Sequence, residues 1–161
     1  MRHGKAESFG AEDHNRPLTE RGARDARAAG EWLARQDYVP THAFVSSAAR
    51  TRATWTALVS GSSSAATPDV DDSLYSADPS TVIDVLRGAP EDAAVVVYVG
   101  HNPTAASLAH VLDDGEPDPT AFRALSEGFP VAAVAVLEVL VPWADLDAGT
   151  AHLIDFHVGQ G

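Results

Sequence analysis

The sequence of 161 residues contains no cysteine. This absence excludes disulfide scaffolds, thiol nucleophiles, iron–sulfur clusters and the zinc sites that need thiolate ligands. Positive charge is also scarce, because 11 Lys and Arg residues stand against 23 Asp and Glu residues, which gives a formal net charge of -12. Such a surface repels nucleic acids and anionic membranes, so we expect neither as a partner.

Long hydrophobic runs are missing as well. The longest apolar stretch, residues 131–141, is interrupted by Glu138, and the N-terminal segment has no apolar signal region. We therefore expect no membrane span and no signal peptide, and a cytoplasmic location. Apolar residues nevertheless make up 45% of the chain, which is enough to bury one core of ordinary size. A single domain over residues 1–161 is the expectation from this length.

Strand-like and helix-like patterns alternate along the chain. Apolar runs predict strands over residues 43–46, 93–99, 131–139 and 151–158. Amphipathic or Ala-rich spacing predicts helices over residues 19–36, within 46–60, and over 79–88 and 104–112. A loop with at most a short strand is expected at 61–72, and a turn at 115–119. The β-branched run at 93–99 is typical of a central parallel strand that is covered on both faces. We expect an α/β fold, a three-layer sandwich with a mainly parallel central sheet flanked by helices.

Ligands of such folds bind beyond the carboxyl ends of the strands, and charged side chains follow two of the predicted strands. Arg50 follows the strand at 43–46, His101 follows the strand at 93–99, and Arg2 and His3 stand at the N-terminus. Arginine offers forked donors to phosphoryl oxygens, and a neutral imidazole can attack phosphorus. These four residues predict a site that handles phosphate.

Three motifs occur in order along the chain: Arg-His-Gly at residues 2–4, Asp-x-x-Arg-Pro-Leu-Thr-x-x-Gly at 13–22, and Gly-His-Asn-Pro at 100–103. With them the sequence resembles the phosphoglycerate mutase-like histidine phosphatase superfamily, and within it the small SixA-type phosphohistidine phosphatases. Segments 46–54, 74–75, 129–132 and 143–149 extend the resemblance over nearly the whole chain. Arg-His-Gly alone is a weak signal, whereas the three motifs together are a strong one.

The resemblance implies that His3 is the nucleophile, that Arg2 and Arg50 bind the phosphoryl oxygens, and that His101 completes the pocket. The phosphoryl group would pass to His3 and then to water, a scheme that requires no metal and no other cofactor. The function implied is a metal-independent phosphatase that removes phosphate from phosphohistidine on a protein partner. Two alternatives stay open: a small-metabolite phosphomonoesterase of the same superfamily, and a non-catalytic module that binds phosphate.

One feature departs from the family pattern. Family members normally have an apolar strand directly before Arg-His-Gly, whereas only Met1 precedes Arg2 here. We expect residues before Met1 in the native protein, because without such a strand Arg2 and His3 would lie on a frayed terminus.

Residues around the motifs receive more modest predictions. Arg16 forms a salt bridge with Asp13 or contacts the substrate, and the salt bridge is the favoured interpretation. Asp78 and Glu7 are the nearest candidates for a general acid, although both lie in segments where a carboxylate is ordinarily exposed. The remaining expectations place His14 in a loop near the cleft, Arg52 on the surface or rim, and Trp55 and Tyr75 in the core or cleft wall.

Overall fold

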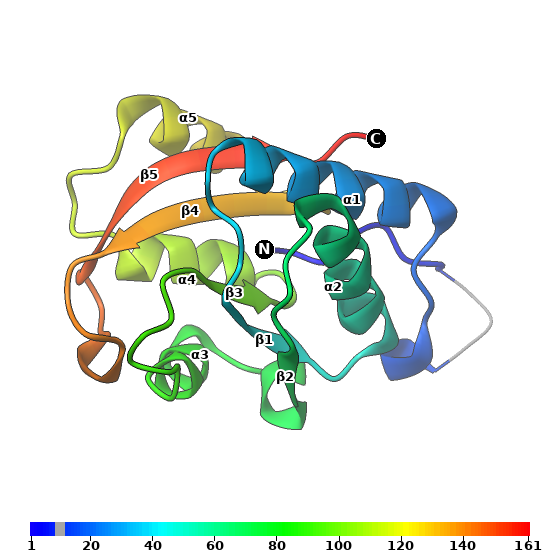
Figure 1. Ribbon diagram of the computed structural model, residues 1–161, viewed down its shortest axis with the longest axis horizontal. Helices are drawn as coiled ribbons and strands as arrows, with labels where there is room; N and C mark the ends of the chain where they lie inside the picture. The colour runs from blue at the N-terminus through cyan, green and yellow to red at the C-terminus, as the bar shows by residue number, and fades with distance from the viewer. Residues whose placement is uncertain (9–11) are drawn as a thin grey trace.

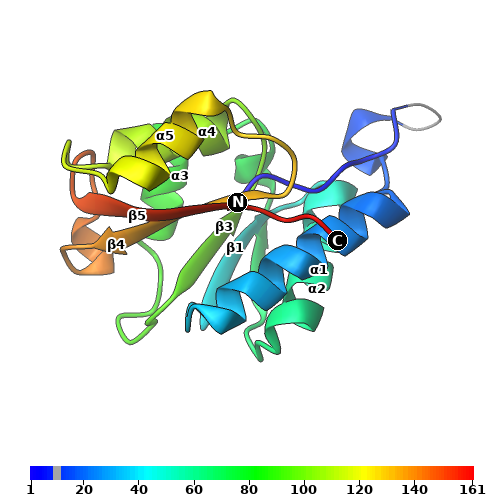
Figure 2. The ribbon, with the colours of Figure 1, turned by 90° about the horizontal axis from the view of Figure 1, so that it is seen from above.

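The structure is a computed structural model that describes residues 1–8 and 12–161. Its elements, in chain order, are η1 (Asp13–Asn15), α1 (Glu20–Arg35), β1 (His42–Ser46), α2 (Ala49–Ser62), β2 (Pro68–Asp71), η2 (Asp72–Tyr75), α3 (Pro79–Leu86), β3 (Val96–Val99), α4 (Thr104–Leu112), α5 (Pro119–Glu127), β4 (Ala133–Val139), η3 (Trp143–Asp145) and β5 (Ala151–Val158). Helices α1 and α2 cover one face of the strands, and α3, α4 and α5 cover the other (Figures 1 and 2). The expected α/β sandwich is confirmed. No helix in the described part of the chain is long and apolar enough to cross a membrane.

The strands form a parallel group and an antiparallel pair. β1 lies between β2 and β3 and is parallel to both, while β4 and β5 are antiparallel. Residues at the N-terminus join the two groups, because Arg2 forms a parallel bridge with Gly100 and its backbone N–H donates to the carbonyl of Ala133 at 3.0 Å. The carboxyl ends of β1 and β3 therefore meet the N-terminal segment at one edge.

The N-terminal residues are held by hydrogen bonds rather than frayed. The amino group of Met1 donates to the carbonyl of Tyr98 at 2.8 Å, and the backbone N–H of Gly100 donates to the carbonyl of Met1 at 3.0 Å. His3 donates from its backbone N–H to the carbonyl of Gly100 at 3.0 Å and accepts from Ala132 at 3.1 Å. β3 and the start of β4 therefore hold Arg2 and His3 from both sides.

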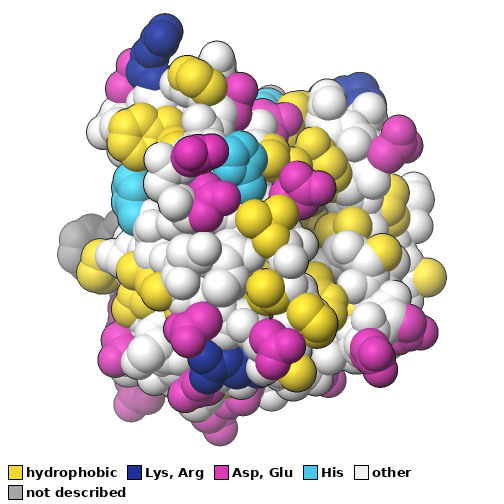
Figure 3. All heavy atoms as spheres, turned by 90° about the vertical axis from the view of Figure 1, so that its left-hand side faces the viewer, with side chains coloured by type: hydrophobic (Ala, Val, Ile, Leu, Met, Phe, Trp, Pro, Cys, Tyr) yellow, Lys and Arg dark blue, Asp and Glu magenta, His cyan; other side chains and the backbone are white. Residues whose placement is uncertain are grey.

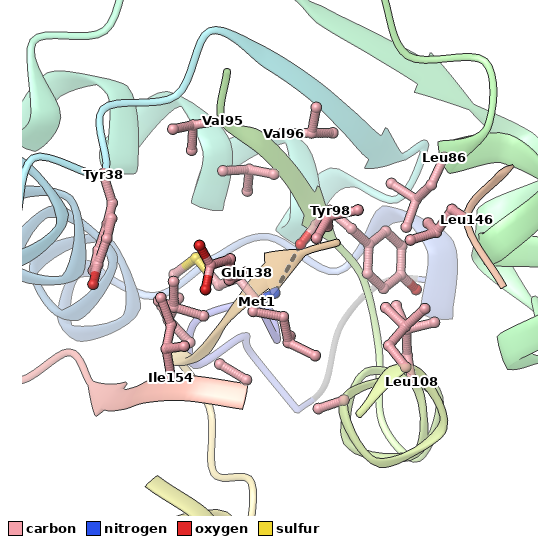
Figure 4. A pocket seen from close by; sticks show the side chains of 18 of the residues that line it. Met1, Tyr38, Leu86, Val95, Val96, Tyr98, Leu108, Glu138, Leu146 and Ile154 are labelled. Atoms are coloured by element: carbon pink, nitrogen blue, oxygen red, sulfur yellow. Dashed lines mark hydrogen bonds between the residues drawn. The ribbon is translucent and has the colours of Figure 1, made fainter. Parts of the chain in front are cut away.

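Beyond Met1 the two groups of strands separate around an apolar cleft of about 580 Å³. Figure 4 shows Met1, Val95, Val96 and Tyr98 on its walls, with the hydrogen bond from the amino group to Tyr98 at its end. Burial in this apolar surrounding lowers the pKa of the Met1 amino group to about 5. None of the four predicted site residues lines this cleft.

Successive side chains of β1 and β3 point alternately into two hydrophobic cores. Phe44 and Tyr98 point into the core shared with α3, α4 and α5, whereas Val45 and Val99 point into the core shared with α1 and α2. Successive side chains of a strand face opposite sides, so a strand covered on both faces needs an unbroken apolar run. This need explains the apolar composition of β1 and β3.

Close packing of α1 against α2 sets the position of the helix that carries Arg50. A Cβ on Gly30 would lie 2.1 Å from the carbonyl oxygen of Leu58, and one on Gly61 would lie 2.1 Å from that of Arg27. Only glycine permits the two backbones to approach this closely. α1 begins where the side chain of Thr19 accepts from the N–H of Gly22, as a helix N-cap does.

Two elements differ from the sequence-based expectation. β3 is shorter than the predicted 93–99, because pairing with β1 begins at Val96. α5 was not expected after the turn at 115–119, although its start carries a strong local signal. Asp118 accepts from two backbone N–H groups at that start, and Pro119 occupies the first turn. The short strand β2 lies within the predicted loop at 61–72, as that expectation allowed.

Candidate active site

The four predicted site residues come together at the carboxyl ends of β1 and β3. Arg50 lies in the first turn of α2, and His101 lies two residues beyond the end of β3. The rings of His3 and His101 lie side by side, tilted by 60°, with centroids 5.4 Å apart, and a guanidinium nitrogen of Arg50 lies 3.3 Å from Nδ1 of His101. Residues separated by about a hundred positions in sequence thus lie next to one another.

The ring of His3 is oriented by its neighbour. Its Nδ1 lies 2.7 Å from the carbonyl oxygen of Gly4, which can only accept, so Nδ1 carries the proton. The neutral ring then has its lone pair on Nε2. The backbone N–H of Gly4 in turn donates to Thr54 Oγ1 at 2.9 Å, and a Cβ on Gly4 would lie 2.6 Å from the carbonyl of Gly22. Thr54 and the absence of a side chain at Gly4 therefore fix where His3 stands.

Each arginine is anchored by a backbone carbonyl. Arg50 is buried and donates to the carbonyl of Asp13 at 2.6 Å and to its carboxylate at 3.2 Å. Arg2 donates to the carbonyl of Phe129 at 2.9 Å, and Asn102 donates to the same oxygen at 2.8 Å. Both arginines keep a buried Nε without a protein partner. Their remaining donor capacity suits an oxyanion in this cleft.

Asp13 links Arg50 to Tyr75, beside the ring of His101. Its carboxylate accepts from Arg16 at 2.9 Å, from Arg50 at 3.2 Å and from the hydroxyl of Tyr75. The hydrogen bond from Tyr75, followed by those from the arginines, lowers the pKa of Asp13 to about 2. The predicted salt bridge between Asp13 and Arg16 is confirmed. The sequence did not predict that Asp13 also binds Arg50, because no local pattern connects η1 with α2.

Both histidines are neutral at physiological pH. Burial, followed by the positive charges of Arg50, Arg2 and Arg16, lowers the pKa of His3 to about 4, although the hydrogen bond to Gly4 opposes this shift. Burial and the charge of Arg50 likewise lower the pKa of His101 to about 4. A neutral imidazole with a free Nε2 beside several guanidinium groups can attack a phosphoryl group whose charge those groups stabilise.

Neighbouring residues from the sequence analysis fall into three groups. Tyr75 forms part of the cleft wall, with its ring edge-on to His101 at 5.5 Å, whereas Trp55 is buried in the core between α1, α2 and the strands. His14 lies near the cleft, with Nε2 2.9 Å from Ser47 Oγ, and Arg52 is exposed. Sequence reasoning missed Ser46, whose Oγ lies 2.8 Å from Nε2 of His101.

Both acid candidates are exposed carboxylates. Asp78 is the N-cap of α3 and accepts from the N–H of Thr81 at 2.8 Å and from Ser80 Oγ at 2.9 Å. These hydrogen bonds lower the pKa of Asp78, so its carboxyl is ionised at neutral pH. Glu7 is exposed.

A hollow of about 400 Å³ opens beside His101. η2 and the start of α3 form one wall through Tyr75 and Pro79, and the start of α4 forms the other through Thr104 and Ser107. Exposed residues at its rim leave it open to solvent. No group of three or more possible metal ligands occurs among residues 1–8 and 12–161.

Charge is distributed unevenly around the molecule. Acidic side chains lie scattered over the face formed by the α4–α5 and β4–β5 connections, where few Lys or Arg side chains appear (Figure 3). At the cleft, by contrast, Arg2, Arg16 and Arg50 all act on His3. A chain with a net charge of -12 therefore still places three arginines around His3.

Comparison with known proteins agrees with this geometry. The family model described as the histidine phosphatase superfamily (branch 1) matches residues 1–76. A solved structure assigned as the phosphohistidine phosphatase SixA of Nakamurella multipartitia is 33% identical, with a TM-score of 0.84 over 99% of this chain and 93% of that one. This chain belongs to the histidine phosphatase superfamily, in its SixA-type branch.

Other relatives of this SixA-type chain extend over similar lengths. An uncharacterized protein of Mycobacterium tuberculosis is 39% identical over 160 residues, which cover 98% of this chain and 99% of that one. A structure assigned as SixA of Agrobacterium tumefaciens is 29% identical, with a TM-score of 0.79 over 98% of this chain and 94% of that one. The protein histidine phosphatase SixA complexed with tungstate is 24% identical with a TM-score of 0.80, and it shows the shared fold over 99% and 94% of the two chains. Family and site together support phosphatase activity.

Proposed function

We propose that this chain is one histidine phosphatase domain that removes the phosphoryl group from phosphohistidine on a protein, without a metal. His3 attacks phosphorus through Nε2, the phosphoenzyme is hydrolysed by water, and Arg2, Arg50 and His101 surround the transferring group. The observation that carries the proposal is the orientation of His3. Its proton is held on Nδ1 by Gly4, so the nucleophilic lone pair is on Nε2, in a ring that lies beside His101.

Leaving-group chemistry supports phosphohistidine as the substrate. Expelling an alkoxide needs a positioned proton donor, whereas imidazole is far less basic and leaves with less help. Asp78 is ionised and committed to the start of α3, and Glu7 is exposed. Without a general acid, cleavage of an alkyl phosphate loses about 10²–10⁴-fold relative to a reaction that has one.

The shape of the site supports a substrate side chain presented by a protein. The open hollow beside His101 has room for a ring and the backbone next to it, and its rim is exposed. Small metabolites are ordinarily bound in pockets that bury most of their surface. A folded protein that presents phosphohistidine needs no such enclosure.

The test measures the covalent intermediate and the substrate preference in the same preparation. A ³²P-labelled phosphohistidine peptide is mixed with enzyme, quenched in alkali, and the label is mapped by proteolysis. We expect an acid-labile adduct on His3 that His3→Ala loses, whereas His110→Ala, at an exposed histidine of α4, retains it. A label on another residue rejects the nucleophile assignment.

Substrate preference is read from kcat/KM for the phosphohistidine peptide and for a simple alkyl phosphate. The peptide is expected to be the better substrate, and Asp78→Asn and Glu7→Gln are expected to leave the ratio unchanged. If the alkyl phosphate is better and one of these variants selectively abolishes its hydrolysis, the enzyme is a small-metabolite phosphatase. If phosphate binds but no substrate turns over, the chain is a binding module.

A further inference from the structure

His101 is held through both of its ring nitrogens. Nε2 lies 2.8 Å from Ser46 Oγ, and Nδ1 lies 3.3 Å from a terminal nitrogen of the Arg50 guanidinium. A guanidinium group carries only donors and stays protonated, so Nδ1 must accept. The single proton of the neutral ring is therefore on Nε2, where it is donated to Ser46. His101 thus has the opposite tautomer to His3, whose proton is on Nδ1.

The surroundings of His101 favour this neutral form. Burial and the charge of Arg50, with smaller contributions from His3 and His14, lower the pKa of His101, and only the carboxylate of Asp13 opposes them. A second proton at Nδ1 would point at the guanidinium of Arg50. The charged and titratable groups around the ring, from every element packed against it, are Arg50 of α2, His3 of the N-terminal segment, Asp13 and His14 of η1, and Tyr75 of η2.

Ser46 is rigidly placed for this contact. It is the last residue of β1, which is paired with a strand on each side, and it is fully buried. Its carbonyl accepts from Thr51 Oγ1 at 2.7 Å, which joins the end of β1 to the first turns of α2. The Ser46 hydroxyl has no side-chain partner other than His101 among the described residues. A strand end therefore holds the ring by the nitrogen that faces away from Arg50.

We propose that Ser46 is a positioning residue: it accepts the Nε2–H of His101 and so holds the ring beside His3 with Nδ1 against Arg50. The kinetic part of this inference rests on the proposed function. With Nε2–H bound to Ser46 and Nδ1 bound to Arg50, the ring is held in one orientation beside His3. Without Ser46, the ring loses the acceptor of its Nε2–H and can turn away from Arg50, after which neither tautomer is fixed.

The direct test is the tautomer of His101 in protein labelled with ¹⁵N at histidine, with signals assigned by comparison with His101→Gln. At pH 7 we expect a protonated Nε2 and an unprotonated Nδ1 in the unaltered protein. Ser46→Ala should show both tautomers in exchange. The matched control is Ser62→Ala, at another buried serine, whose hydroxyl has no partner to lose. Ser46→Cys, which keeps a weak acceptor of similar size, should partly restore the Nε2–H form.

Kinetics with the phosphohistidine peptide give the second measurement. Ser46→Ala should lower kcat about 10-fold, the scale of one lost hydrogen bond, with KM changed less, and Ser62→Ala should not change kcat. An Nδ1–H tautomer in the unaltered protein, or an unchanged tautomer and kcat in Ser46→Ala, overturns the inference. If the tautomers behave as expected but no phosphoramidate turns over, the proposed function fails while the positioning of His101 by Ser46 stands.

Discussion

Replacing His3 by Gln should make the protein less sensitive to acid. The pKa of His3 is lowered from 6.5 to about 4 by burial and by the charges of the surrounding arginines. In the unfolded chain the ring regains its ordinary pKa, so between these two values the unfolded state binds more protons than the folded state. Stability therefore rises with pH through this interval and is lost as the pH falls. Gln carries no proton to titrate, so His3→Gln removes this contribution at every pH.

The expected magnitude follows from the two pKa values. Between pH 7 and pH 5 the unfavourable protonation of His3 costs the unaltered protein about 2 kcal/mol of unfolding free energy. His3→Gln also loses the hydrogen bond to Gly4, but that loss is independent of pH over this interval and cancels in the difference. When the pH falls from 7 to 5, the free energy of unfolding of His3→Gln should therefore rise by about 2 kcal/mol relative to that of the unaltered protein.

Urea unfolding at both pH values, followed by circular dichroism, measures this double difference. His110→Gln serves as the control for substituting a histidine outside the cleft, on the exposed side of α4. If the gap between His3→Gln and the unaltered protein is the same at pH 7 and pH 5, the ring of His3 is not desolvated. The argument that it is a neutral nucleophile would then lose its electrostatic basis.

Three further outcomes are expected. Orthovanadate should inhibit turnover and EDTA should not, since a five-coordinate vanadate resembles the in-line transition state; recovery of lost activity by Mg²⁺ or Zn²⁺ after chelation would contradict metal independence. Gly4→Ala should lower kcat about 100-fold with an unchanged circular dichroism spectrum, because its Cβ would displace the turn that carries His3; wild-type kcat would refute this. Gly30→Ala should lower the free energy of unfolding, measured by urea titration, by about 1–2 kcal/mol, because the clash with Leu58 exceeds the gain in helix propensity. A more stable variant would show that α1 and α2 can separate without cost.

Local sequence signals were sufficient for the fold class and for the identity of the four candidate site residues. The apolar run before Gly100 predicts a buried strand, and Pro79 after Asp78 predicts the start of a helix, because strand burial and helix capping depend on neighbours within a few residues. The same dependence made α5 predictable in principle from Asp118 and Pro119. The order of the three motifs indicated the family before any contact was known.

Tertiary structure alone decided how these residues act on one another. Ser46 and His101 are 55 positions apart, and Asp13 and Arg50 are 37 positions apart, so neither pair leaves a mark in local periodicity. The tautomer of His101 depends on a serine from one strand and a guanidinium from a helix, and the N-terminal segment is held by β3 and the start of β4 rather than by its own sequence. Hydrogen-bond partners and desolvation arise only when distant segments pack together, which is why the sequence by itself determined which side chains are present and only the fold determined their protonation and orientation.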